Sequence, residues 1–171
     1  MPESAPLDRI LAVRQAEPGQ VVDVDGPMIK LVVFTLDDQW FAFLGEKIRE
    51  VLAETPVFFL PCCPAMLEGV MNVRGTLESV VRLRPLLGLG EGQASKGSRI
   101  LVGQTSSMRS GIRVDRVEEV LDIPVSTLHA PPGAVSDRMK ALLLGIVDFQ
   151  DHPVHVLDLD RIFEDLLAGL R

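Results

Sequence analysis

The sequence has little of what nucleic-acid-binding proteins contain. It has one tryptophan, no tyrosine and seven phenylalanines, and its 24 acidic residues outnumber its 17 basic residues, which gives a net charge of −7. Proteins that bind nucleic acid need a basic surface to neutralise phosphates, and those that bind single strands add aromatic side chains on which bases stack. We therefore expect no nucleic-acid partner.

Long apolar runs and spaced cysteines are also missing. No apolar run approaches the roughly 20 residues that span a bilayer, and the N-terminus lacks the basic-then-apolar pattern of a secretory signal. The two cysteines, Cys62 and Cys63, are adjacent, and neighbouring cysteines form a disulfide only with strain. These absences predict a cytoplasmic protein with reduced thiols and no direct insertion into a membrane.

The residues that are present favour a β-rich domain. Hydrophobic residues make up 47% of the 171 residues, which is enough for the core of one domain of ordinary size. Short apolar runs separated by turn residues begin near residue 30. They predict hairpins at 31–45, 70–83, 98–117 and 142–159, a buried strand at 55–61 that ends at a proline, and an amphipathic helix at 161–170.

The chain also repeats itself. Residues 30–52 align without a gap with residues 99–121, and residues 69–87 align with residues 145–163. The extra length falls between 122 and 144, where a Pro-rich loop absorbs it at little cost. Each copy supplies about five strands, enough to curl into a small barrel. Chance similarity between short apolar strands is the competing interpretation of this repeat.

Several motifs in this order resemble the CheW domain family. They are LVVFTLDDQWFAF, IREVL, LPCCPAMLEGVMNVRG, SVVRLRPLLGL, GIRVDRVEEVL and LLLGIVDFQDHPVHVLDLDRIF. The resemblance implies a mainly β fold in which two five-stranded SH3-like barrels share a core, with short helices and a C-terminal helix. It implies no catalysis and no cofactor. We expect an N-terminal arm and linker at 1–27 and one domain at 28–171, with two intertwined barrel subdomains at roughly 30–90 and 98–165.

The resemblance also implies a function and partners. Similar proteins are adaptors that bind the regulatory domain of a CheA-type histidine kinase and the cytoplasmic tip of chemoreceptors (methyl-accepting chemotaxis proteins) in membrane-associated arrays. The family commonly has Pro-Val-x-Asp-Leu after Arg-Gly, whereas this sequence has Ser79 for the proline, Arg82 for the aspartate and Glu78 at a usually apolar position. An adaptor of a twitching-motility or accessory array is therefore an alternative.

Two sets of residues are candidates for contact with partners. Asn72, Arg74 and Gly75 form a turn, and the resemblance places Arg74 at the receptor interface, with Asn72 bracing the turn through its amide. Arginine suits such a role because its planar group donates several hydrogen bonds. The resemblance places a second set, Ile48, Glu50 and Val51, near a kinase or receptor interface, and core packing explains the aliphatic members of this set equally well. In the second copy, Asp115 and Glu119 are interpreted as a solvated strand end.

Other classes of function find less support. No hydrolase elbow, Walker motif or dinucleotide-binding glycine pattern is present. A metal- or redox-responsive regulator could use Cys62, Cys63, His152 and His155, but zinc-site spacing is missing, so no metal site is predicted. Small barrels also bind oligonucleotides, and the acidic balance argues against that interpretation here.

Overall fold

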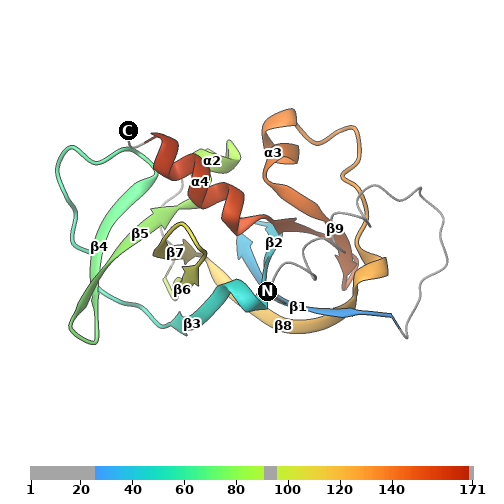
Figure 1. The fold of residues 1–171 in the computed structure, drawn as a ribbon, viewed down its shortest axis with the longest axis horizontal. Helices are drawn as coiled ribbons and strands as arrows, with labels where there is room; N and C mark the ends of the chain where they lie inside the picture. Colours follow the sequence, from blue (N-terminus) through green and yellow to red (C-terminus); the bar gives the residue numbers. More distant parts are fainter. Residues whose placement is uncertain (1–25, 91–95, 170–171) are drawn as a thin grey trace.

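The computed structural model describes residues 26–90 and 96–169, so the arm predicted at 1–27 lies outside the described residues except for Gly26 and Pro27. The described chain forms two five-stranded sheets that lie side by side (Figure 1). Sheet A has the order β8 (Arg116–Pro124), β1 (Met28–Leu36), β2 (Gln39–Leu44), β10 (His152–Leu157) and β9 (Leu143–Phe149). Sheet B has the order β3 (Ile48–Leu52), β6 (Arg99–Gln104), β7 (Arg109–Val114), β5 (Thr76–Arg82) and β4 (Leu67–Val73). This is the mainly β fold of two five-stranded SH3-like subdomains that the resemblance implies.

Three helices complete the described fold. They are α2 (Leu83–Leu87), α3 (Asp137–Ala141) and α4 (Leu159–Gly169), with 3₁₀ turns at Gly45–Lys47 and Val125–Thr127. Helix α4 follows the last strand of sheet A and packs across sheet B. The two approach closely at Gly103 on β6, because a Cβ there would lie only 2.8 Å from Leu159 Cδ2. Helix α3, which the sequence analysis missed, begins at Ser136, whose hydroxyl accepts a hydrogen bond from the Met139 amide. The C-terminal helix is confirmed.

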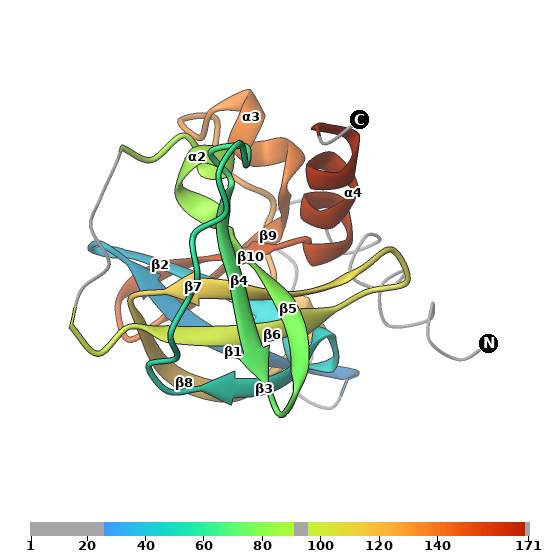
Figure 2. The same ribbon diagram turned by 90° about the vertical axis from the view of Figure 1, so that its left-hand side faces the viewer.

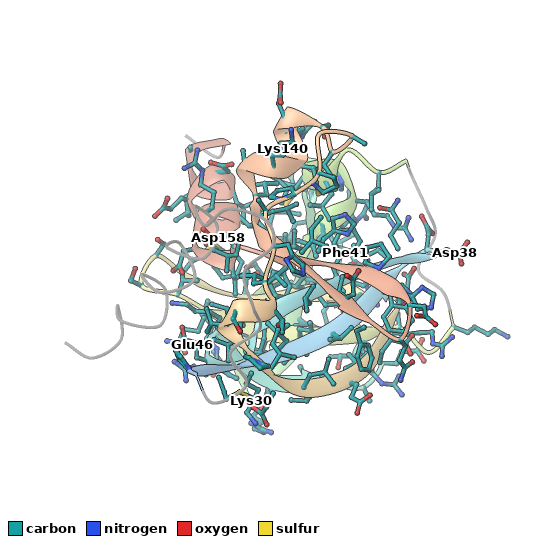
Figure 3. The ribbon with its side chains drawn as sticks, turned by 90° about the vertical axis from the view of Figure 1, so that its right-hand side faces the viewer. Lys30, Asp38, Phe41, Glu46, Lys140 and Asp158 are labelled. Atoms are coloured by element: carbon teal, nitrogen blue, oxygen red, sulfur yellow. The ribbon has the colours of Figure 1, made fainter. Side chains whose placement is uncertain are left out.

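Both faces of the central strands are buried, which explains their nearly continuous apolar runs. One face of sheet A forms a cluster that includes Leu31 and Val33, and the other face contributes Phe34 and Phe41 to a core shared with sheet B and the helices. Figure 3 shows Phe41 among the strands and Asp38 at the tip of the β1–β2 hairpin. At the same end of sheet A, the Trp40 ring stacks on His152, with centroids 4.4 Å apart.

The sequence repeat is confirmed by the strand register. In β3–β6, Leu52 pairs with Ile100, and in β8–β1 the aligned residues Leu121 and Leu31 pair in the same way. A bulge interrupts both ladders at aligned positions, and β4–β5 and β9–β10 also share one register, including their bulges. Each sheet combines a hairpin from one copy with three strands from the other. Residues 30–90 and 98–165 therefore each contribute to both sheets.

Two local predictions were wrong. Residues 55–61 do not form a buried strand: among the described residues only Phe58 of this segment pairs, with Val70 at the outer edge of β4, and the side chains of Phe58, Phe59 and Leu60 are exposed. Gly69 allows that close approach, since a Cβ there would lie 2.1 Å from the Phe58 carbonyl oxygen. Asp115 is not a solvated strand end either, because it accepts hydrogen bonds from Arg84 and from the Asp37 amide and is 14% exposed.

Candidate binding site around the β4–β5 turn

The turn between β4 and β5 has the geometry of a tight hairpin. Arg74 and Gly75 both have positive φ angles, 52° and 86°, as the two central residues of a type I′ turn do. The predicted bracing is present, because the Gly75 amide donates a hydrogen bond of 2.8 Å to Asn72 Oδ1. Glycine suits the second position because it lacks a Cβ. The turn thus fixes the backbone from which Arg74 projects.

The structure brings the two predicted residue sets together through one ion pair. Arg74 Nη1 lies 3.0 Å from Glu50 Oε2, although the two residues are far apart in the sequence. Figure 2 shows the tip of the β4–β5 hairpin and β3 at the same end of the molecule, and these strands are the opposite edges of sheet B. The Arg74 and Glu50 side chains therefore bridge the two edges of sheet B.

The two members of the ion pair differ in exposure. The Arg74 side chain is 78% exposed and the Glu50 side chain 22%. Glu50 Oε1 is buried and has no hydrogen-bond partner among the residues that the structure describes. Arg74 is thus anchored on one side by a carboxylate and presents most of its guanidinium to solvent, where it can donate to an acceptor on another molecule.

Exposed apolar residues lie close in the chain to both members of this ion pair. Val51 follows Glu50 on β3 and is 45% exposed, and Leu77 lies two residues after Gly75 and is 70% exposed. The sequence analysis missed Leu77. Its position beside the Arg74–Gly75 turn was the feature of the sequence that could have indicated it. Ile48, by contrast, packs against the shared core, so of the second predicted set only Glu50 and Val51 reach this surface.

A second group of exposed apolar side chains precedes β4. Phe58, Phe59 and Leu60 are 61%, 74% and 41% exposed. They were missed because the apolar run was interpreted as a buried strand. Exposed apolar residues in a row are uncommon on monomeric proteins and mark surfaces that contact other molecules.

The unusual residues on β5 are accommodated in different ways. Glu78 Oε1 accepts a hydrogen bond of 2.9 Å from Arg109 Nε on β7, and the Ser79 hydroxyl lies 2.7 Å from that of Ser110. Arg82 is exposed and stands at the N-cap of α2 without a capping hydrogen bond. Glu78 and Ser79 are therefore satisfied inside sheet B, whereas Arg82 is available to solvent.

The residues of the alternative metal or redox site are not brought together. Cys62 and Cys63 lie in the segment before β4 beside sheet B, and His152 and His155 lie on β10 in sheet A. Within 26–90 and 96–169, no three His, Cys, Asp or Glu side chains are grouped as a metal ion would require. None of the helices in these ranges is both long and apolar enough to cross a membrane.

Comparison with known proteins identifies relatives of this arrangement. The sequence profile of the CheW-like domain matches residues 30–167. The chain is 31% identical over 137 residues to the chemotaxis protein CheW of Thermotoga maritima, covering 80% of this chain and 89% of that one. It is 27% identical to the chemotaxis protein CheW of Rhizobium meliloti, covering 78% and 86%, and 31% identical to protein FrzA of Myxococcus xanthus, covering 82% and 81%.

A solved structure supports the same assignment. The crystal structure of the scaffolding protein TtCheW from Thermoanaerobacter tengcongensis superposes with a TM-score of 0.69 at 28% identity, covering 77% of this chain and 90% of that one. Profile, sequence and fold agree over most of the chain. The chain therefore belongs to the CheW-like domain family, and it is a non-catalytic adaptor of chemotaxis-type signal transduction, not an enzyme.

Proposed function

We propose that this adaptor couples chemoreceptors to a CheA-type histidine kinase, and that the surface around Arg74 is where it meets the receptor tip. The observation that carries the proposal is the Glu50–Arg74 pair, which joins the two edges of sheet B and holds an exposed arginine in a fixed place. Arginine anchors surrounded by apolar side chains are typical of the residues that dominate binding energy at protein interfaces. Recruitment to membrane-associated arrays, from the cytoplasm, would follow from receptor binding.

The roles of the neighbouring residues follow from their positions. Asn72 and Gly75 set the turn, Glu50 orients the arginine, and Val51 and Leu77 offer apolar surface on either side. Ile48 contributes through the core. We propose that the regulatory domain of the kinase contacts another part of the molecule, so that both partners are held at once.

The experiment that tests the proposal is calorimetric binding of the purified chain to two ligands: a receptor-tip fragment and the kinase regulatory domain from the same source. We expect Arg74→Glu to weaken receptor binding by about 2 kcal/mol or more, as loss of an interface anchor does, and to leave kinase binding unchanged. Arg74→Lys should be intermediate, because lysine keeps the charge and loses the planar fork.

A matched control exists in sheet A. Gln150, the aligned residue, also has a positive φ angle, 49°, in the β9–β10 turn. Gln150→Glu makes a change to negative charge on the same backbone and should leave receptor binding unaltered. If Arg74→Glu binds the receptor tip as the parent does, Arg74 is not at that interface. If the parent binds neither ligand, the proposed coupling of receptor to kinase fails.

An adaptor of a different array is a second candidate, favoured by one observation. Arg82 is exposed and positive where the family commonly has an aspartate, and a reversed charge at an interface changes partner choice. Under this alternative, Arg82→Asp would increase affinity for the receptors and kinase of a flagellar system, while the parent would prefer those of a twitching or accessory system. Equal affinities of parent and variant for both systems would remove it.

A further inference from the structure

The two halves of the chain depend on each other for four of the eight strand pairs in the sheets. We call residues 26–90 the first half, with β1–β5, and residues 96–169 the second half, with β6–β10. The strand pairs inside the halves are four hairpins: β1–β2 and β4–β5 in the first, β6–β7 and β9–β10 in the second. The pairs β1–β8, β2–β10, β3–β6 and β5–β7 all join one half to the other.

Each half alone would therefore keep two hairpins and a single unpaired strand. An isolated hairpin is at best marginally stable in water, and three or more strands with a buried face are needed for independent stability. Both halves also contribute to the shared core: the first supplies Phe34 and Phe43, and the second supplies Ile112 and Phe163. Separation would expose all of these side chains.

We infer that the chain consists of two complementary binding partners fused end to end: the first half recognises the second half specifically, and neither folds without the other. In other words, the protein is a covalently linked heterodimer of half-domains, not a pair of consecutive barrels. The inference is independent of the partner-binding function proposed above, because it concerns only contacts within the chain.

Charge pairing between the halves makes their recognition specific. Ion pairs that join a residue of the first half to one of the second include Glu68–Arg113 at 2.7 Å, Glu78–Arg109 at 2.9 Å, Lys47–Asp160 at 3.1 Å and Arg84–Asp115 at 3.2 Å. In each pair at least one side chain is less than one quarter exposed. Leaving such a partly buried charge without its partner is unfavourable.

The internal repeat allows these ion pairs to be compared with the pairs that would form between two copies of the same half. If a first half were joined to a second copy of itself, aligned residues would replace the missing partners. Glu78 would then face Trp40 where Arg109 stands now, and Lys47 would face Arg84 where Asp160 stands now. Glu68 would likewise face Leu44 in place of Arg113, whereas Arg84 would face Glu46 in place of Asp115 and stay paired. Three of the four pairs would therefore be lost or become repulsive.

Two second halves would fail in the same way. Arg109 would face Val154 in place of Glu78, and Asp115 would face Asp160 in place of Arg84. Arg113 would face Leu144 in place of Glu68, whereas Asp160 would face Arg116 in place of Lys47 and stay paired. Three of the four charge pairs therefore oppose like pairing of either half, and all four are satisfied between unlike halves.

Assembly of the halves also creates the candidate site. Glu50 lies on β3, whose neighbouring strand is β6 of the second half. Without β6, β3 is not held in sheet B, and Glu50 cannot meet Arg74. The Glu50–Arg74 ion pair therefore forms only when the two halves are assembled, even though both residues belong to the first half.

The test uses the full chain with a sequence-specific protease site in place of residues 91–95, cleaved after folding. The fragments are separated in denaturant and returned to buffer alone and together, and their circular dichroism and gel-filtration volumes are measured. We expect loss of the β-sheet spectrum in each fragment alone and its recovery in a 1:1 complex of the two. A fragment that regains the β-sheet spectrum alone, as monomer or dimer, would overturn the inference, and so would a mixture that stays unfolded while the uncut chain refolds.

Charge exchange tests the specificity separately. Glu78→Arg in the first fragment should weaken association with the parent second fragment by about tenfold or more. Arg109→Glu in the second fragment should restore it. Arg161→Glu is the matched control, since the Arg161–Asp165 pair is exposed and lies within the second half. Association that is unchanged by Glu78→Arg, or equally weakened by Arg161→Glu, would contradict the proposed role of the ion pairs.

Discussion

Sheets A and B have the same strand connections and register, but their interiors and surfaces differ. The inner cluster of sheet A contains eleven buried hydrophobic residues among those described, whereas that of sheet B contains four. Sheet B and the segment between β3 and β4 carry most of the large exposed apolar residues among those described. These are Val51, Phe58, Phe59, Leu60 and Leu77, whereas sheet A has Met28 and Val120. The subdomain with the smaller interior is also the one that presents apolar surface.

This difference shows how one repeated backbone can serve two tasks. Apolar side chains directed inward stabilise the fold, and apolar side chains left outside are available for a partner. The aligned turns illustrate the same division. In sheet B the turn carries Arg74 beside Glu50, and in sheet A it carries Gln150 and Asp151 beside the Trp40–His152 stack. We therefore expect sheet A to dominate stability and sheet B to dominate binding.

The largest expected effect is on the free energy of unfolding, and it differs between the inner clusters of the two sheets. Leu31 and Ile100 are aligned residues, both fully buried, one in each inner cluster. Substitution of a buried leucine or isoleucine by alanine costs about 2–5 kcal/mol, depending on how far the surroundings relax. We expect Leu31→Ala to fall near the upper end and Ile100→Ala near the lower end, because Leu31 packs in a cluster of eleven buried hydrophobic residues and Ile100 in a cluster of four. Urea denaturation would measure both.

The exposed valines at aligned edge positions provide the control for that measurement. Val51→Ala and Val120→Ala should each change the free energy of unfolding by no more than about 0.5 kcal/mol, as surface substitutions do. If Ile100→Ala lowers the free energy of unfolding as much as Leu31→Ala does, the two subdomains contribute equally to stability, and sheet A does not dominate it.

A smaller effect concerns the two aligned helices. Asp158 precedes α4 and accepts a hydrogen bond of 3.2 Å from the Arg161 amide, whereas its counterpart Arg82 precedes α2 and gives no such cap. An aspartate at this position satisfies a free amide and favours the helix N-terminus. We expect Arg82→Asp to increase the free energy of unfolding by about 1 kcal/mol, and Asp158→Arg to decrease it by at least as much. An Arg82→Asp variant with a lower thermal midpoint would contradict this account.

The smallest effect concerns the turn between β1 and β2, where acid should weaken sheet A. A hydrogen bond from Arg84 lowers the pKa of Asp37. A carboxyl with a lowered folded-state pKa stabilises the fold above its unfolded value, near pH 4, and loses that contribution as the pH falls toward the folded value. Asp37→Asn should therefore reduce the dependence of stability on pH below about pH 4. The aligned turn of sheet B has serines at 106 and 107, and Ser106→Ala should leave the acid dependence as it is.

Much of the fold could be predicted because the sequence repeats. The alignment of 30–52 with 99–121 carries the register of the ladders, and turns such as Arg74–Gly75 mark the hairpins. The exchange of hairpins between the sheets could not be predicted, because the same alternation of apolar residues fits pairing within a copy or between copies. The resemblance to the CheW domain family, and not the periodicity of apolar residues, predicted that the two subdomains are intertwined.

The candidate site was predicted residue by residue but not as a unit. Nothing in the spacing of Glu50 and Arg74 indicates contact, since they meet only when the two edges of sheet B approach each other. The segment at 55–61 was misassigned because a short apolar run does not reveal whether another strand covers it. Asp115 was misassigned for a related reason, as its partner Arg84 comes from a helix in the other copy.

The stack of Trp40 on His152 gives the protein a built-in optical probe. Trp40 is the single tryptophan, and it lies on β2 of the first half against a residue of β10 in the second. Its emission is therefore sensitive to whether these two strands are side by side, because the stack on His152 forms only when they are. Ultraviolet excitation should follow the closing of sheet A in real time without any dye, while a ligand seated at Arg74 would leave that signal undisturbed.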